Sequence, residues 1–335
     1  MRLLLALPGL VAPSQARPNA PALSALARLI AAAGVPSREP EGLGAALAPH
    51  YAITRQIDWP LAPLRLAALG GDPGDAYWLA ADPVTLVAGR EDVRPAGAVT
   101  DLAPADAERM IATLNRHFAA DGLTFVAPQP DTWFVRAPSP PQMHTHALDA
   151  AAGHALRALL PEGPGAGPWR RWLSEIQMLL HDHPVNVERE QSGRASVNSV
   201  WFSGGGTLPP RAAPGARVLT WANGGIATAF ALHAGRPALA VPASLASIFD
   251  NIDDAPHLAV AFDAPLDLAK IGSAWAAPAW NALSSGRLEA VTLIADGAGE
   301  AVTWTVGRPG RWQQIRQRFV QHDLDALLDA VRPAP

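Results

Sequence analysis

The sequence predicts an α/β fold, in which helices cover both faces of a β-sheet and a smaller α+β domain is inserted into the chain. From residue 197 onward, short apolar strands alternate with helical patterns, as in sheets that are covered on both faces. The middle of the chain instead shows strands on both sides of a single helix. The 335 residues, of which 49% are hydrophobic, are sufficient to bury a sizeable core.

The first elements form a strand–helix unit. An apolar run over 3–7, turning at Pro8-Gly9, indicates a core strand, and a short signal peptide ending at Ser14-Gln15-Ala16 is the alternative. Apolar residues on one stripe predict a helix from about residue 20 to residue 33. A second helix is predicted over 61–69, before the Gly- and Asp-rich run at 71–75 that marks a domain boundary.

The pattern then changes to that of an α+β module with a connecting helix. Pro104, with Asp106 in the following turn, begins a clear amphipathic helix. Around it we predict strands over 76–81, 84–87, 123–126 and 133–135, and a later helix over about 169–180.

The remainder should complete the sheet of the core domain. The strands predicted there are 197–202, 218–221, 238–241, 258–262, 290–294 and 302–306, and the helices are 226–233, 274–283 and 324–331. Residues 1–71 contain too little to form a core alone. We therefore predict a core domain of residues 1–71 and 197–335, and an inserted domain of residues 72–196.

Composition excludes several classes of function. The net charge of −4 argues against a nucleic-acid partner, and zero cysteines exclude disulfides, thiol nucleophiles and Cys-ligated metals. No apolar stretch reaches the roughly 18–20 residues of a membrane-spanning helix, so we expect no membrane partner and a cytoplasmic location. Lys270 is the only lysine, because arginine supplies every other basic side chain.

The densest polar segment lies between residues 181 and 206. Asn186, Arg189 and Asn198 can hydrogen-bond an anionic ligand, and Gly204, Gly205 and Gly206 at a strand end allow close approach of a ligand to main-chain N–H groups. In the alternative interpretation, the two asparagines satisfy loop main chain and Arg189 packs at a domain boundary. The glycines match neither a Walker A loop nor a dinucleotide-binding motif.

Other polar groups give weaker signals. The pairs His144/His146 and His181/His183 have no third ligand at a telling spacing, and they lie in chain that we expect to be irregular, so we predict no metal. Asn223-Gly224-Gly225 can form an anion site at a helix N-terminus or a plain turn. The acidic candidates near strand ends are Asp253, Asp254, Asp263, Asp267 and Asp296.

Several of these segments together resemble a known family. His183-Pro184-Val185-Asn186, Arg189, Val197-Asn198 and Gly204–Gly206 are similar to a segment of the archaeal-type cofactor-independent phosphoglycerate mutases. With Glu175–Leu180 and Trp201–Gly206, most of the chain resembles the bacterial regulatory protein RpfE family, whose members are often labelled phosphoglycerate mutase. The resemblance implies an alkaline-phosphatase-like core with an insert.

The resemblance also implies a test of activity, because the active mutases use two divalent metals, Asp and His ligands and a Ser nucleophile. This chain has Pro8-Gly9 where the enzymes have Asp-Gly, and Asp296-Gly297 where they have Asp-His. No Asp-x-x-x-His pair is found near Asp263. We therefore expect a regulatory or ligand-binding protein without catalytic residues or cofactors.

The partners expected from the resemblance are a phosphorylated small molecule and a protein. One alternative is a working phosphoglycerate mutase or phosphatase with rearranged ligands, drawn from Asp253, Asp254, Asp263 and Asp296. The other is a scaffold whose Trp- and Pro-rich surface binds a macromolecule.

Overall fold

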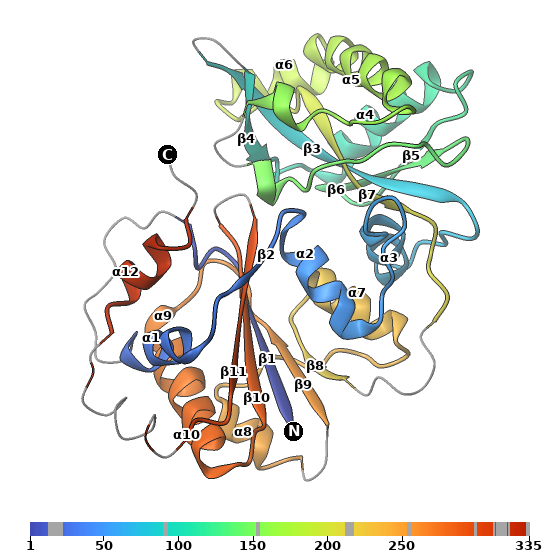
Figure 1. Cartoon of the computed structure of the whole chain (residues 1–335). Coiled ribbons are helices and arrows are strands. Elements are labelled where there is room, and N and C mark those ends of the chain that lie inside the picture. Colours follow the sequence, from blue (N-terminus) through green and yellow to red (C-terminus); the bar gives the residue numbers. More distant parts are fainter. Residues whose placement is uncertain are drawn as a thin grey trace. The chain divides into compact units, whose positions relative to one another are not determined.

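The chain divides into two compact units. The computed structural model describes residues 1–12, 23–89, 93–151, 155–211, 218–252, 256–297, 300–310, 312, 320 and 322–332. The first unit comprises Met1–Ala52 and Arg211–Pro335, and the second comprises Ile53–Pro210 (Figure 1). No helix in the described ranges is long and apolar enough to cross a membrane.

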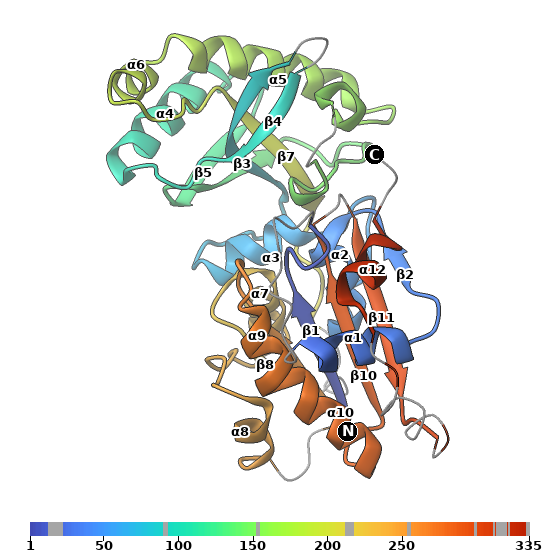
Figure 2. The same ribbon diagram turned by 90° about the vertical axis from the view of Figure 1, so that its left-hand side faces the viewer.

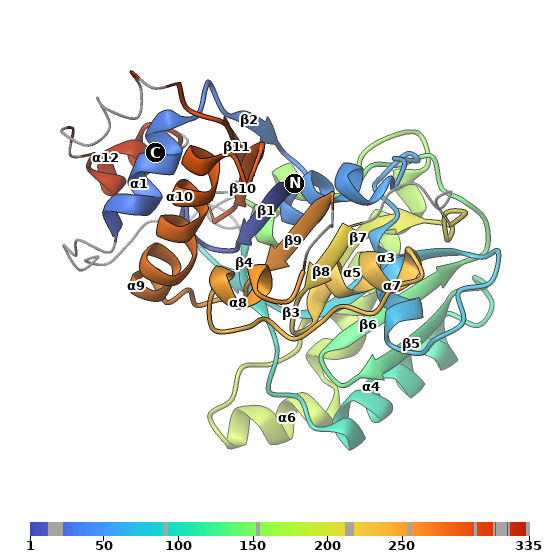
Figure 3. The ribbon, with the colours of Figure 1, turned by 90° about the horizontal axis from the view of Figure 1, so that it is seen from below.

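The first unit is built on a six-stranded sheet of order β2-β11-β10-β1-β9-β8 (Figure 3). Strands β10, β1, β9 and β8 are parallel, and β11 and β2 continue the sheet antiparallel to their neighbours. From Leu3 to Leu7 every residue of central strand β1 is buried, as expected of a strand that is covered on both faces. The strand bounds are β1 Arg2–Leu7, β2 Ser37–Glu39, β8 Val218–Trp221, β9 His257–Ala261, β10 Ala290–Ala295 and β11 Ala301–Gly307.

Helices cover both faces of this sheet. One group lies in front of the strands in Figure 2: α1 Leu23–Ala32, α8 Leu245–Phe249, α9 Leu268–Lys270, the π-helical turn η4 Ile271–Ala276, α10 Ala277–Ser285 and α12 Leu324–Asp329. The other group packs together on the opposite face: α2 Gly42–Leu47, the 3₁₀ turn η1 Ala48–Tyr51 and α7 Gly225–His233. The predicted α/β class is confirmed.

The second unit is an antiparallel sheet with helices. Strand β3 pairs with β7 along one edge and with β4 and β6 along the other, and β6 also pairs with β5. The bounds are β3 Tyr77–Ala88, β4 Val93–Ala98, β5 Thr124–Gln129, β6 Thr132–Ala137, β7 Ser199–Gly206, α3 Leu61–Ala68, α4 Pro104–His117, α5 Ala166–His181, α6 Pro184–Gln191, and the 3₁₀ turns η2 Asp149–Ala151 and η3 Leu156–Leu159.

The boundaries between the units differ from the predicted ones. Residues 53–71 and 197–210, which we assigned to the core domain of residues 1–71 and 197–335, belong to the second unit rather than the first. The reason is pairing: β7 forms a ladder with β3, and α3 packs on both strands. The inserted part is therefore longer than the predicted 72–196, and the strand expected at 197–202 belongs to its sheet.

Three smaller differences concern individual elements. The strands expected at 76–81 and 84–87 form one continuous strand, β3, which runs through Pro83. The strand expected at 238–241 is reduced to a single bridge between Leu239 and Trp221. The alternative cleavage site at 14–16 and the predicted helix start at residue 20 lie outside the described residues.

Candidate functional site

The polar segment singled out in the sequence forms a network within the second unit. Asn186 is 1% exposed on α6, and its amide donates to the main-chain oxygens of Leu180, at 2.6 Å, and Val197, at 2.8 Å. Its side-chain oxygen accepts from the Val197 N–H at 2.9 Å. The side chain thus joins the end of α5 to the chain that enters β7.

Arg189 is a fully buried cation with main-chain partners. Its Nε donates to the Ala195 carbonyl at 2.7 Å, and its two terminal nitrogens donate to the carbonyl and the carboxylate of Asp101, at 3.2 and 2.5 Å. The hydrogen bond from Arg189 lowers the pKa of the Asp101 carboxyl group below its ordinary value. The guanidinium is directed at this chain's own groups and has 0% exposure.

The remaining predicted residues also have structural partners. Asn198 pairs with the main chain of β3 by donating to the Leu86 carbonyl at 2.8 Å and accepting from its N–H at 2.7 Å. The run Gly204–Gly206 lies so close to α3 and Tyr77 that a Cβ on Gly205 would collide with the tyrosine hydroxyl, and one on Gly206 with Pro60. These contacts support the structural alternative, and a ligand-binding role for the six residues stays a prediction.

The histidine pairs lie in ordered surroundings of their own. His183 caps α6 with Pro184 at its first turn, so this stretch is helical and not irregular as we expected. His144 Nδ1 lies 3.5 Å from the Asp58 carboxylate, which also accepts from Thr145. Among the described residues no three His, Cys, Asp or Glu side chains gather as metal ligands.

His183 gives a testable pH dependence. Its Nδ1 accepts from the Val185 N–H and its Nε2 lies 3.1 Å from the Thr113 hydroxyl, an arrangement that needs the neutral ring. Burial, together with the charge of Arg109, lowers the His183 pKa below 6.5. Because the unfolded chain then binds the proton more readily, stability from this group is present above pH 6.5 and lost as pH falls below it.

We expect His183→Asn, which keeps a capping side chain without a titrating group, to remove part of this loss. The measurement is the urea unfolding midpoint of both proteins between about pH 8 and 5. Equal pH dependence in wild type and variant would show that His183 binds its proton equally well in the folded and unfolded chains.

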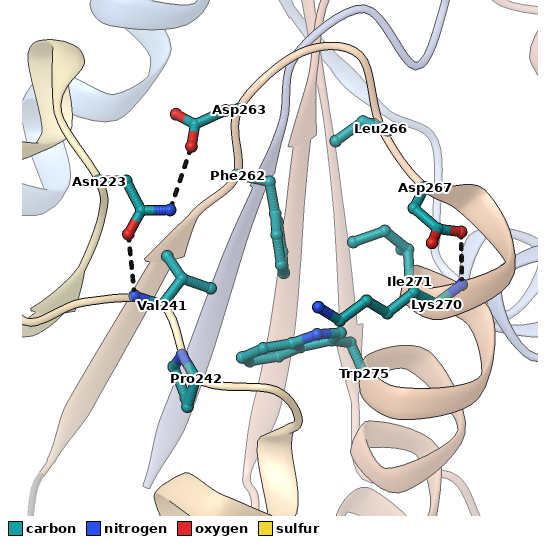
Figure 4. A pocket seen from close by; sticks show the side chains of 10 residues that line it. All are labelled: Asn223, Val241, Pro242, Phe262, Asp263, Leu266, Asp267, Lys270, Ile271 and Trp275. Carbon is teal, nitrogen blue, oxygen red and sulfur yellow. Dashed lines mark hydrogen bonds between the residues drawn. The ribbon is translucent and has the colours of Figure 1, made fainter.

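A pocket of about 200 Å³ lies in the first unit, at the carboxyl ends of two parallel strands (Figure 4). Asn223 follows β8, and Phe262 and Asp263 follow β9. Ligands of open α/β sheets bind at this edge, where the loops after the strands converge. The helical run α9–η4–α10 closes another side through Asp267, Lys270 and Trp275.

Two carboxylates in this pocket are held by hydrogen bonds. Asn223 donates to Asp263 at 3.1 Å and accepts from the Val241 N–H at 3.2 Å, so its amide orientation is fixed from both ends. Asp267 caps α9 by accepting from the Lys270 N–H at 3.0 Å. The Lys270 ammonium has no ion pair within the part of the chain that the structure describes.

Trp275 forms part of the pocket wall and carries an unused donor. The residue is 0% exposed, and its ring packs edge-to-face on Phe262 with centroids 5.0 Å apart. Its indole Nε1 has no hydrogen-bond partner among the described residues. Trp275 also lies on η4, and π-helical turns occur frequently at functional sites.

The described residues at the ends of β1 and β10 offer few side chains that could ligate a metal. Gly9, directly after β1, donates its N–H to the Asp296 carboxylate at 2.6 Å, so a main-chain group occupies one oxygen of this acid. Asp263 is engaged by Asn223. The chemistry of these donors, with Pro8-Gly9 and Gly297 at the strand ends, does not fit a two-metal centre. Asp253 and Asp254 lie outside the described residues.

Sequence reasoning found part of this pocket. It named Asn223, Asp263 and Asp267 as weak candidates, but it did not bring them together and it missed Lys270 and Trp275. The available signal was that Lys270 is the only lysine in a chain that otherwise uses arginine. A compact ammonium is a different chemical group from a planar guanidinium, so this position differs chemically from every other basic position in the chain.

Comparison with known proteins finds no sequence match and only weak structural similarity. No protein-family model and no curated protein matches the chain. A cofactor-independent phosphoglycerate mutase from Thermoplasma acidophilum is 15% identical, over 100% of this chain and 95% of that one, with a TM-score of 0.44. The PH0037 protein from Pyrococcus horikoshii is 13% identical, over 99% and 98%, with a TM-score of 0.45. The function is therefore inferred from this chain's own residues.

Proposed function

We propose that this protein binds a small organic molecule in the pocket at the ends of β8 and β9, in a regulatory or sensing role, without a two-metal catalytic centre. The observation that supports it is the charge arrangement of the pocket. Lys270, the only lysine, lines the same pocket as Asp263 and Asp267, so a protein cation is present where acids alone would suit dications.

The resemblance to the phosphoglycerate mutases and to the RpfE family is compatible with this proposal. The resemblance supplies the expectation of a phosphorylated small-molecule ligand, whereas the expectation of a cytoplasmic location comes from the sequence itself. A binding role asks less of the site than phosphoryl transfer, which needs metals or other cations to neutralise the transferring group. The protein partner expected from the resemblance is also part of this proposal, because a regulatory protein acts on a partner.

Manganese tests the proposal directly. We expect calorimetric titration of the full chain with MnCl₂ to show no saturable uptake of two ions, and a coupled assay to show no conversion of 3- to 2-phosphoglycerate above that of Asp263→Asn. The melting temperature should be equal with manganese and with a chelator, because a ligand that binds only the folded state raises it.

Two tightly bound manganese ions per chain, together with turnover that Asp263→Asn abolishes, would overturn the proposal in favour of a working mutase. Asp182→Asn is the matched control, because Asp182 is an exposed acid of the second unit with 94% side-chain exposure.

A further inference from the structure

The pocket at the ends of β8 and β9 presents both signs of charge to its ligand. Asp263, Asp267 and Lys270 are all exposed, and at neutral pH two carboxylates and one ammonium sum to a formal charge of −1. The hydrogen bonds that the two acids accept, from Asn223 and from the main chain of Lys270, use only part of their acceptor capacity. The site can therefore bind a cationic group and an anionic group at the same time.

Trp275 points to the place of the anionic group. Trp275 lines the same pocket as Lys270, and both side chains are drawn in Figure 4. A buried N–H without a partner is costly, and a ligand oxygen would satisfy it. Lys270 and Trp275 thus give this pocket one charged and one neutral donor, neither of which has a side-chain partner among the described residues.

The remaining walls and the size limit the rest of the ligand. Val241, Pro242, Leu266 and Ile271 supply aliphatic surface. The volume of about 200 Å³ is below the roughly 300–1,000 Å³ of sites for drug-sized ligands, so the ligand is small.

We propose that the pocket binds a small aliphatic amino acid. Lys270 and the Trp275 N–H receive its carboxylate, Asp263 and Asp267 receive its protonated amine, and the aliphatic wall receives its side chain. This inference rests on the proposed function and names the class of ligand for the same site.

The same charges disfavour the phosphorylated ligand that the resemblance implies. A phosphate monoester carries close to two negative charges at pH 7. In this pocket it would meet one ammonium and two carboxylates, and the unfavourable pairs outnumber the favourable ones. An amino acid has no net charge. Its carboxylate can pair with the ammonium, and its protonated amine can pair with the carboxylates.

A matched series of ligands tests the proposal by calorimetry on the full chain in the presence of a chelator. L-leucine carries both charged groups, 4-methylpentanoate lacks the amine, and 3-methylbutylamine lacks the carboxylate. We expect leucine to bind at least about tenfold more tightly than either truncated compound and than 3-phosphoglycerate. Valine and alanine are titrated beside it to cover smaller side chains.

Variants assign each end of the ligand to its partner. Lys270→Met should weaken leucine about tenfold and leave 3-methylbutylamine unchanged, whereas Asp263→Asn should weaken leucine and the amine but not the acid. Trp275→Phe keeps an aromatic ring in the wall, removes a donor that has no partner among the described residues, and should cost about fivefold in affinity. The smaller ring also leaves space at a buried position, so its melting temperature should fall. Asp182→Asn should change nothing.

The outcomes separate the two proposals. Equal affinity for leucine and 4-methylpentanoate would show that the amine is not recognised and would overturn the amino-acid assignment. Tighter binding of 3-phosphoglycerate would also overturn it, while leaving the metal-independent binding role intact. Failure of leucine, valine and alanine alike to bind would overturn it as well, and only the manganese result bears on catalysis.

Discussion

Replacing Arg189 by alanine is expected to lower the free energy of unfolding by about 2–5 kcal/mol, the range for truncating a large buried side chain to alanine. The variant leaves the Ala195 and Asp101 carbonyls without their donor and opens a cavity where a fully buried side chain was packed. Because the chain has two units, the measurement is urea unfolding followed by both far- and near-ultraviolet circular dichroism.

Arg109 provides the control for this experiment. It also pairs with a carboxylate, that of Glu188 at 2.9 Å, but both side chains are exposed, at 43% and 57%. Arg109→Ala should therefore cause a much smaller decrease, since exposed ion pairs contribute little. If Arg189→Ala kept wild-type stability and instead abolished ligand binding, the structural assignment of Arg189 would be wrong and the predicted anion site would regain support.

Replacing Asn186 by alanine is expected to cost about 2–4 kcal/mol, because the N–H and the carbonyl of Val197 lose their partner in a buried place. The Leu180 carbonyl loses one of its donors and keeps the N–H of His183. Asn186→Asp should not rescue stability. It keeps an acceptor for the Val197 N–H but turns a negative charge, at a site that is 1% exposed, toward two carbonyl oxygens.

Asn198→Ala serves as the comparison for Asn186→Ala and should have a smaller effect on stability. Asn198 also bonds a main-chain N–H and carbonyl, both of Leu86, but it is only half-buried, so water can replace part of what is lost. Unfolding midpoints should fall in the order wild type, Asn198→Ala, Asn186→Ala. Equal midpoints for all three proteins would contradict the conclusion that these asparagines stabilise the fold by bonding main-chain groups.

The local elements were readable because their signals are local. Pro104 at a first turn placed α4, and the apolar run over 3–7 placed β1. Pro184 can begin a helix in the same way, but we interpreted the proline beside His183 as a sign of irregular chain, whereas His183 caps α6. Failures of this kind arise where two local interpretations compete.

The domain boundaries and the pocket were not readable in the same way, because both depend on pairs that are distant in sequence. Strand β7 has the apolar pattern of a core strand, and only its ladder with β3, more than a hundred residues earlier, assigns it to the second sheet. The polar segment around Arg189 had the residue types of an anion site, and only the geometry shows that main-chain groups already use its donors.

Residue types and their periodicity were sufficient for the α/β class and for the absence of cysteine chemistry. Tertiary structure alone decided that Asn223, Asp263, Lys270 and Trp275 share one pocket. The physical reason is that parallel strands bring their carboxyl ends to one edge of the sheet whatever their spacing along the chain.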